Sequence, residues 1–502
     1  MELEFDREVL HCYQVLSTKT INQEETMESI VPDACPDIQE IMGVYGQAFL
    51  EQKQGEEGGA TLSGTVHTTV LYRPEEWQGL KKLTVKLPFT IRLDEGGRQC
   101  VIQGRVWVKC ASANILNPRK ILLRVELAGC VMLLQPVKQV LCQGVLEPER
   151  WNIEEKKTEC ESYQLCVAQE KPFSFSEQIR TNGTGEEELL WWKAKPQCSE
   201  CKRIGNKLIF KGNVEVELLL QQNEGELTTH QENLPFSQVM ELAEAGDSGD
   251  CQVMVELKSM DCVQGDGHGW ELSLELVAQG QVWQPQSFAL LQDLYSTTHE
   301  TKVQMEHCSL LQRMEQPEQT ISLRELVETE EMPRTVLEQW VTVGETTRRQ
   351  DGDGLKLESK AYVTVLYLDE AGTLHVVEKT FPLSCQLELG ADVSHLTWGI
   401  WPGEVYVSPA VGGLEVRCTF EVPCLCLKEQ DIAWVSGATL GEERQKKTGR
   451  QPSMVLRLAS PEESLWDLAK TYGTTMQQIA AANQLEGEQL PLGSMLLIPA
   501  IR

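Results

Sequence analysis

The sequence predicts a mainly β protein that consists of three repeated antiparallel β-sandwich-like domains and a small βααβ domain at the C-terminal end. Two observations support this fold class. Segments in which apolar and polar residues alternate recur with a period of about 147 residues, which indicates internal duplication of a strand-rich domain. The last fifty residues differ, because two short helical patterns lie there between two strand-like segments.

Three kinds of strand recur in the same order within each repeat. The first is GTVHTTVLY, GNVEVELLL and SKAYVTVLY, beginning at Gly64, Gly212 and Ser359. The second contains a proline, and these prolines lie 147 residues apart at Pro88, Pro235 and Pro382. The third is ILLRVELAG, WELSLELVA and EVRCTFEVP. We therefore predict β-rich domains at residues 1–145, 146–300 and 301–435.

The period of two within these segments predicts half-buried antiparallel strands. In the second repeat, Val214, Val216 and Leu218 share one face of a strand, and Glu215 and Glu217 share the other. Segments such as GEEGG, NEGE, DGDG and DEAG separate the strands and predict hairpin turns. A short helix is expected near residues 36–42, and the polar segment 436–452 is expected to be a flexible linker.

Residues 453–502 have the pattern of a complete small domain. Ser464 and Asp467 predict a capping box, and the apolar stripe that follows ends at Gly473, which favours a helix C-terminus. Thr474 and Gln477 repeat the capping pattern and predict a second helix. Leu496, Leu497 and Ile498 before Pro499 predict a closing strand.

Composition excludes several classes of partner. The formal net charge is −30 in 502 residues, which argues against binding to nucleic acid and against electrostatic attachment to anionic lipid. The acidic N-terminal segment lacks the apolar stretch of an export signal, and no run approaches the ~20 apolar residues of a membrane helix. The 17 cysteines are odd in number and irregular in spacing, which favours reduced thiols in a cytosol.

No motif in the chain predicts catalysis, a cofactor or a metal ion. Cys198 and Cys201 have the spacing of half a zinc site, but no second pair follows, so we expect ordinary reduced cysteines or else a thiol pair used in cross-linking. The loop 350–354 contains two aspartates but lacks the further ligands of a calcium loop, so we expect a hairpin turn there. Loop 265–270 is also expected to be a turn.

The C-terminal domain resembles the LysM family, which has a βααβ fold and is best known for binding the N-acetylglucosamine backbone of peptidoglycan and chitin. The resemblance rests on Leu465, Trp466, Ile479, Asn483, Leu485, Gly493, Ile498 and Pro499. It implies a binding groove between two loops, lined by Pro461, Glu462, Glu463, Ser464, Leu490, Pro491, Leu492 and Gly493. Trp466 is either a core residue or an aromatic side chain of that groove.

One departure from the LysM pattern bears on the ligand of this groove. The chain has Glu462 and Glu463 where the family usually has Gly-Asp. A glutamate adds bulk and charge where a glycine would let the backbone approach a sugar closely. The change therefore favours a protein over a glycan as the ligand.

The repeats resemble the SPOCS (spore coat and stalk) domain. The segments that carry this resemblance are VPDACPDIQEIMGVYG at 31–46, the GxVxxxVLY strand, the LPF strand and DLYST at 293–297. The second repeat departs from it, since FSEQIRTNGTG stands where the first repeat has its Cys-Pro-Asp-Ile-Gln segment. Three SPOCS-like repeats followed by one LysM domain is the arrangement of SipL-like spore-coat morphogenetic proteins.

The SipL resemblance implies a location and partners. It implies a protein of the mother-cell cytosol that is recruited to the forespore and spore coat surface. The implied partners are a SpoIVA-like coat morphogenetic ATPase and other coat proteins. Our leading hypothesis is a non-enzymatic scaffold that docks through its LysM domain on this ATPase. The alternatives are a protein that binds peptidoglycan or another N-acetylglucosamine glycan, and an enzyme that acts on wall polymers.

Overall fold

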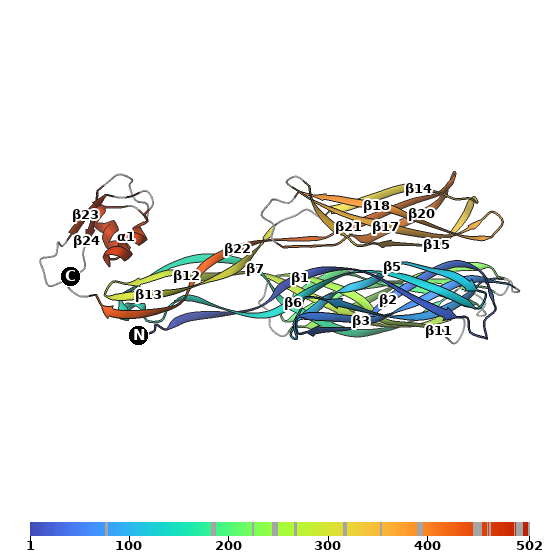
Figure 1. Cartoon of the computed structure of the whole chain (residues 1–502), viewed down its shortest axis with the longest axis horizontal. Coiled ribbons are helices and arrows are strands. Elements are labelled where there is room, and N and C mark those ends of the chain that lie inside the picture. Colours follow the sequence, from blue (N-terminus) through green and yellow to red (C-terminus); the bar gives the residue numbers. More distant parts are fainter. Residues whose placement is uncertain are drawn as a thin grey trace.

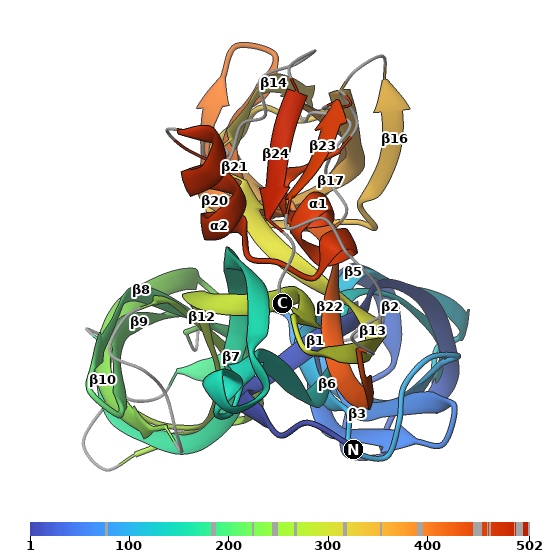
Figure 2. The same cartoon turned by 90° about the vertical axis from the view of Figure 1, so that its left-hand side faces the viewer.

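The computed structural model shows an elongated, mainly β molecule, which confirms the predicted fold class. A stalk of paired strands extends from the body of the molecule, and the small helical domain lies at the far end of the stalk (Figure 1). The view along the stalk shows that the body consists of three bundles of strands that lie side by side (Figure 2). The structure describes residues 1–75, 79–181, 187–222, 225–242, 249–265, 269–314, 319–351, 354–388, 395–444, 454–458, 460, 463–485, 487 and 495–499.

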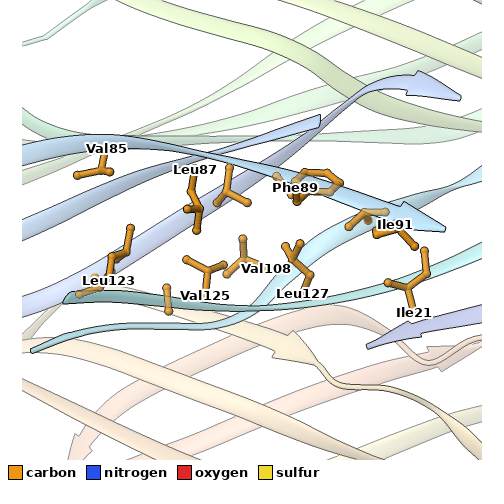
Figure 3. Close-up of a cluster of buried hydrophobic side chains, with 14 of the residues drawn as sticks. Ile21, Val85, Leu87, Phe89, Ile91, Val108, Leu123, Val125 and Leu127 are labelled. Carbon is orange, nitrogen blue, oxygen red and sulfur yellow. The ribbon is translucent and has the colours of Figure 1, made fainter. Parts of the chain in front are cut away.

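The first unit contains six strands in two facing sheets. The strands are β1 (Phe5–Ile30), β2 (Ile38–Glu56), β3 (Gly59–Pro74), β4 (Lys81–Leu93), β5 (Val101–Asn117) and β6 (Lys120–Val145). One sheet has the order β2–β3–β4, and the opposite face is β1–β6–β5. Alternate apolar residues of both faces meet in the core, such as Leu87 and Phe89 of β4 opposite Val125 and Leu127 of β6 (Figure 3).

The second unit repeats this arrangement after a short 3₁₀ helix, η1 (Pro148–Trp151). Its strands are β7 (Ile153–Arg180), β8 (Glu188–Ile204), β9 (Lys207–Gln221), β10 (Leu227–Glu241), β11 (Asp250–Gln264) and β12 (Gly269–Ser296). One sheet has the order β10–β9–β8, and β7, β12 and β11 form the other face. Because Tyr13 of β1 pairs with Leu165 of β7, one sheet of six strands runs through both units.

The third unit has more and shorter strands. They are β13 (His299–Met314), β14 (Gln319–Glu328), β15 (Pro333–Val343), β16 (Thr347–Asp351), β17 (Gly354–Asp369), β18 (Leu374–Leu387), β19 (His395–Trp398), β20 (Trp401–Ala410), β21 (Gly413–Val422) and β22 (Cys424–Glu443). They form sheets β15–β17–β16 with β18, β14–β21–β20 and β13–β22–β19. Their buried side chains form a separate core around Leu357, Val416 and Phe420.

The three units pack around one shared junction, which Figure 2 shows end-on. Leu71, Leu219 and Leu366, at 148- and 147-residue intervals, point outward from their own units and are buried together there. Each buried leucine stabilises such a contact by roughly 1.5–3 kcal/mol. The junction explains why Glu217 is buried, although the alternation in β9 places it on the outer face.

The repeating prolines lie in edge strands. Pro88 is in β4, Pro235 in β10 and Pro382 in β18, and each of these strands pairs with one neighbour in its sheet. A proline has no N–H to donate to a second neighbouring strand, so these positions suit an edge. The predicted hairpin at GEEGG is confirmed, since Glu56 pairs with Gly59 and Gly58 has a φ of 79°. The hairpin at DEAG is likewise present between β17 and β18.

The stalk consists of the ends of the longest strands. Residues 5–15 of β1 pair with β6, residues 153–165 of β7 pair with β12, and residues 299–314 of β13 pair with β22. These ribbons bury a common apolar cluster that includes Leu141, Leu290 and Val435. The third ribbon reaches Glu443, so residues 436–443 are strand rather than the predicted start of the linker. Residues 445–453 lie outside the described part of the chain.

The predicted helix near residues 36–42 is wrong. Residues 33–35 form a turn, and β2 begins at Ile38. Pro32 and Pro36 have no amide hydrogen for a helical bond, which disfavours a helix here. The guanidinium of Arg119 instead donates to the carbonyl oxygens of Cys35 at 2.7 Å and Val31 at 3.0 Å, and thereby holds the segment in its turn.

Candidate binding site at the C-terminal domain

The C-terminal domain has the predicted order of strand, helix, helix and strand. These elements are β23 (Met454–Leu458), α1 (Leu465–Tyr472), α2 (Met476–Asn483) and β24 (Met495–Pro499). The capping box at Ser464 and Asp467 is confirmed, and the hydrogen bond from Ser464 lowers the pKa of Asp467. Gly473 ends α1 with a φ of 64°.

The second capping box lies one residue later than the sequence predicts. Thr475, not Thr474, accepts from the backbone of Gln478, and Gln478 accepts from the N–H of Thr475. Thr474 is fully buried, and its hydroxyl donates to the side chain of Gln478 at 2.6 Å. Adjacent threonines offer the same capping chemistry, so only packing distinguishes them.

Packing and hydrogen bonds join the helices to the two-stranded sheet. Ile479 and Leu468 form the centre of the small core together with Leu496 and Ile498. The amide of Asn483 donates to the carbonyl of Leu497 at 2.7 Å and accepts from its N–H at 2.7 Å. These bonds fix β24 against α2.

Helix α1 docks the domain on the end of β12. Trp466 Nε1 donates to Asp293 Oδ2 at 2.8 Å, and Lys470 Nζ donates to both oxygens of that carboxylate at 2.7 Å. Tyr295 donates its hydroxyl to the carbonyl of Thr474 at 2.8 Å and packs edge-on against the Trp466 ring, with the centroids 4.9 Å apart. We call these contacts the α1–β12 dock.

The dock decides between the two roles considered for Trp466. Its side chain is only 4% exposed and faces β12, and its indole N–H is bound to Asp293. A sugar that stacked on this ring would have to displace Tyr295. The structure therefore favours the core role of Trp466 over that of a groove aromatic.

Only part of the predicted groove lies within the described residues. Those outside are Pro461, Glu462, Leu490, Pro491, Leu492 and Gly493. Glu463 forms an ion pair with Arg457, whose guanidinium also donates to the Tyr472 hydroxyl at 3.2 Å. Ser464 caps α1. Both described groove residues thus make contacts within the domain, and a ligand role for the groove stays a prediction.

The outer side of the small sheet is apolar and exposed. In the register of β23 against β24, Leu456 lies opposite Leu497 and Leu458 lies opposite Met495. Met454, Leu456, Leu458 and Met495 are 53, 62, 59 and 57% exposed. We call Met454, Leu456, Leu458, Met495 and Leu497 the outer sheet face. A compact cluster of exposed aliphatic side chains on a small domain indicates a surface for protein contact.

Sequence reasoning missed both the dock and the outer sheet face. DLYST at 293–297 carries part of the SPOCS resemblance, yet a shift of 147 residues places it opposite LEPER at 146–150 in the first repeat. That difference could have indicated a function special to the second repeat. The alternation of Met454, Leu456 and Leu458 is visible in the sequence. It does not show which side of the strand the helices cover.

The described residues hold no group of three His, Cys, Asp or Glu side chains placed to bind a metal ion. Asp351 pairs with Gly354 in a hairpin, as predicted, while residues 352–353 and 266–268 lie outside the described chain. No helix in the described ranges is both long and apolar enough to span a membrane.

Comparison with known protein families identifies two domains. The family described as "SipL, SPOCS domain" matches residues 187–264, from β8 to the end of β11 in the second unit. The family described as "LysM domain" matches residues 460–499. Both are non-catalytic domain families. No curated protein and no solved structure matches the chain. The chain therefore carries a SipL SPOCS domain and a C-terminal LysM domain, the combination that its sequence resembles.

Proposed function

We propose that this protein is a non-enzymatic scaffold of spore-coat assembly whose LysM domain docks on a SpoIVA-like coat morphogenetic ATPase at the forespore surface. A SPOCS domain joined to a LysM domain fits a sporulation coat protein with a module of the peptidoglycan-binding type. The division into three SPOCS-like repeats, the mother-cell location and the ATPase as partner are parts of the proposal.

The outer sheet face is the observation that supports a protein partner. Its aliphatic side chains offer no hydrogen bonds and no ring on which a sugar could stack, while burial of such side chains drives protein association. Burying one exposed leucine contributes roughly 1.5–3 kcal/mol before the costs of association. Because α1 makes the dock, this face stays free while the domain is attached to the stalk.

A second candidate function is binding of peptidoglycan or another N-acetylglucosamine glycan. The LysM match at residues 460–499 favours it. The burial of Trp466 and the ion pair of Glu463 weaken it, because both remove side chains from the predicted groove. The two functions use different surfaces, so variants can separate them.

Replacing Leu456 by glutamate is expected to weaken binding to the ATPase at least about 30-fold, because it places a charge in the centre of an apolar contact. The affinity of the full chain for the purified ATPase measures this effect, and sedimentation with insoluble peptidoglycan measures glycan binding in parallel. Gln477→Glu is the matched control, since it adds the same charge to an exposed position on α2.

The two assays have opposite outcomes for the two functions. The scaffold proposal requires that the Leu456→Glu variant bind the ATPase much more weakly, while the Gln477→Glu variant retains its affinity. If the full chain sediments with peptidoglycan but has no measurable affinity for the ATPase, the glycan-binding function replaces the proposed one.

A further inference from the structure

A β-bulge in β8 turns two cysteines to the same side of the strand. Residues three apart in a regular strand face opposite sides, which would separate Cys198 from Cys201. The register of β8 against β9 shifts between Cys198 and Glu200, so that Cys198 lies opposite Gly212 and Cys201 opposite Phe210. Gly212 and Phe210 are two residues apart, so both cysteines face the same way. The extra residue of the bulge, Ser199, produces this arrangement.

The side that these cysteines face is the interior of the second unit. Cys198 and Cys201 pack against the core cluster that contains Phe210, and Cys251 of β11 packs against the same cluster. The thiols of Cys201 and Cys251 interact with each other, and the strands that carry them, β8 and β11, are in contact. The two sulfur atoms are therefore close together, although the residues are distant in sequence.

The Cys201–Cys251 contact crosses the seam between two sheets. Strand β8 is the outer strand of the sheet β10–β9–β8, and β11 is the outer strand of the sheet that contains β12 and β7. The two strands run next to each other, but they belong to different hydrogen-bonded sheets. Side chains alone hold this seam closed, so a covalent bond here would change its stability.

A cavity gives small molecules access to the Cys201 thiol. It has a volume of about 570 Å³, lies where the three units meet, and is lined in part by Cys198, Cys201 and Gln252. Pockets of a few hundred cubic ångströms accept small organic ligands. A low-molecular-weight disulfide of the glutathione type can therefore reach the seam without unfolding of the unit.

We propose that Cys201 and Cys251 form a disulfide across the β8–β11 seam by exchange with a low-molecular-weight disulfide, and that this bond locks the SPOCS domain closed. Both cysteines lie within the matched segment 187–264. The disulfide does not depend on the partner of the LysM domain, so experiments can confirm or refute it separately from the proposed function.

The exchange has two steps that balance. The Cys201 thiol, which lines the cavity, loses its proton, and its sulfur attacks the small disulfide, forming a mixed disulfide and releasing one small thiolate, which takes up a proton. The Cys251 thiol then loses its proton and attacks the Cys201 sulfur, which releases the second small thiol. Two protein thiols are oxidised and one small disulfide is reduced to two thiols.

The surroundings of Cys201 affect the rate of the first step. Burial, together with the interaction with Cys251, raises the pKa of the Cys201 thiol. Only the thiolate attacks, so the lock closes slowly near neutral pH and faster as the pH rises. Cys198 is the less suitable partner for Cys201, because side chains on the same face of one strand point in parallel rather than toward each other.

The test uses the folded full-length chain and oxidised glutathione. Exposure at alkaline pH is expected to lower the number of free thiols by two from 17, and peptide mapping without reductant should find residues 201 and 251 linked. Hydrogen exchange of β8 should slow on oxidation, and dithiothreitol should reverse both changes. As a control, the chain is oxidised in denaturant, where Cys201 and Cys251 should not link in preference to other cysteines.

Two variants sharpen the test. Cys198→Ser should keep the linked pair and the slowed exchange, whereas Cys251→Ser should lose both. A folded chain in which Cys201 remains joined to glutathione would overturn the proposal, because it would show that the two sulfurs cannot meet. A link between Cys198 and Cys201 instead would overturn it equally.

Discussion

Replacing Lys193 by methionine is expected to destabilise the junction between the second and third units by about 3–5 kcal/mol, since removal of one partner leaves buried charge uncompensated. Lys193 Nζ lies 2.7 Å from Glu338 Oε1 and is also paired with Glu217. The side chains of Glu217 and Glu338 are only 9 and 3% exposed. Methionine keeps the apolar stem of the lysine but cannot offset the buried charge of Glu217.

Hydrogen exchange of β15, which carries Glu338 to the junction, measures this loss. A single unfolding free energy is not defined for a chain of several units, so a local probe is preferable. Lys202→Met is the matched control on the same strand, because Lys202 is 70% exposed and pairs only with a carboxylate at the surface, that of Glu200. Equal exchange rates in the two variants would contradict the central role of Lys193.

The same cluster gives the junction a pH dependence. Burial raises the pKa of Glu338 to about 8, with Lys193 opposing the shift and Glu217 adding to it. Burial alone would raise the pKa of Glu217, but a hydrogen bond from Glu338 and the charge of Lys193 outweigh burial and lower this pKa. The arrangement is thus a protonated Glu338 that donates to an ionised Glu217, with Lys193 between them and the buried hydroxyl of Tyr45 nearby.

The sign of the effect follows from the raised pKa of Glu338. The folded protein holds a proton that an unfolded glutamate, with a pKa of about 4.3, has released at neutral pH. This contribution to stability is complete below the unfolded pKa and is lost as the pH rises to about 8. Exchange of β15, corrected for the intrinsic pH dependence of amide exchange, should therefore accelerate from about pH 4.3 to about pH 8, the window between the two pKa values.

Glu338→Gln tests this assignment, because glutamine can donate the same hydrogen bond but cannot ionise. The variant should keep the junction closed and flatten the pH dependence of exchange in β15. An unchanged pH profile in Glu338→Gln would assign the dependence to another group.

The sequence predicted the strands well because their causes are local. The alternation in β3 and β9 and the prolines of β4, β10 and β18 depend on which residues face a core or an edge, and the repeats show each pattern three times. Apolar residues that depart from the alternation lie where two or more units meet. Leu71 and Leu219 look like outward apolar residues in a single strand, and they are buried only because three units share one junction.

The parts that the sequence did not predict depend on contacts between distant segments. The stalk exists because β1, β7 and β12 continue as paired ribbons beyond their sheets, and nothing within one strand states where its sheet ends. At the LysM domain, the fold and the first capping box were predictable from local patterns. The position of Trp466 was not, since its partner Asp293 lies 173 residues away.

Replacing Asp293 by alanine is expected to release the LysM domain from the stalk. The change removes the acceptor of a buried indole N–H, and a hydrogen bond to a charged group is worth about 1.5–3 kcal/mol. The bond from Lys470 adds little, because this side chain is 40% exposed and its charge is screened by solvent. The ratio of docked to free domain should thus fall about 10- to 150-fold, since 1.4 kcal/mol corresponds to a factor of ten.

Small-angle scattering and hydrogen exchange detect this release from two directions. A free domain at the end of the stalk should broaden the distribution of interatomic distances, and the peptide that contains Tyr295 should exchange faster. Asp293→Asn keeps an acceptor for Trp466 and should stay largely docked, while Thr471→Ala, an exposed position on α1, should have no effect. If Asp293→Ala changes neither measurement, apolar packing of Tyr295 on Trp466 holds the dock by itself.

Because the outer sheet face lies away from α1, release of the LysM domain should leave the affinity of the chain for the ATPase nearly unchanged. Loss of that affinity on release would instead show that the partner binds the stalk and the LysM domain together.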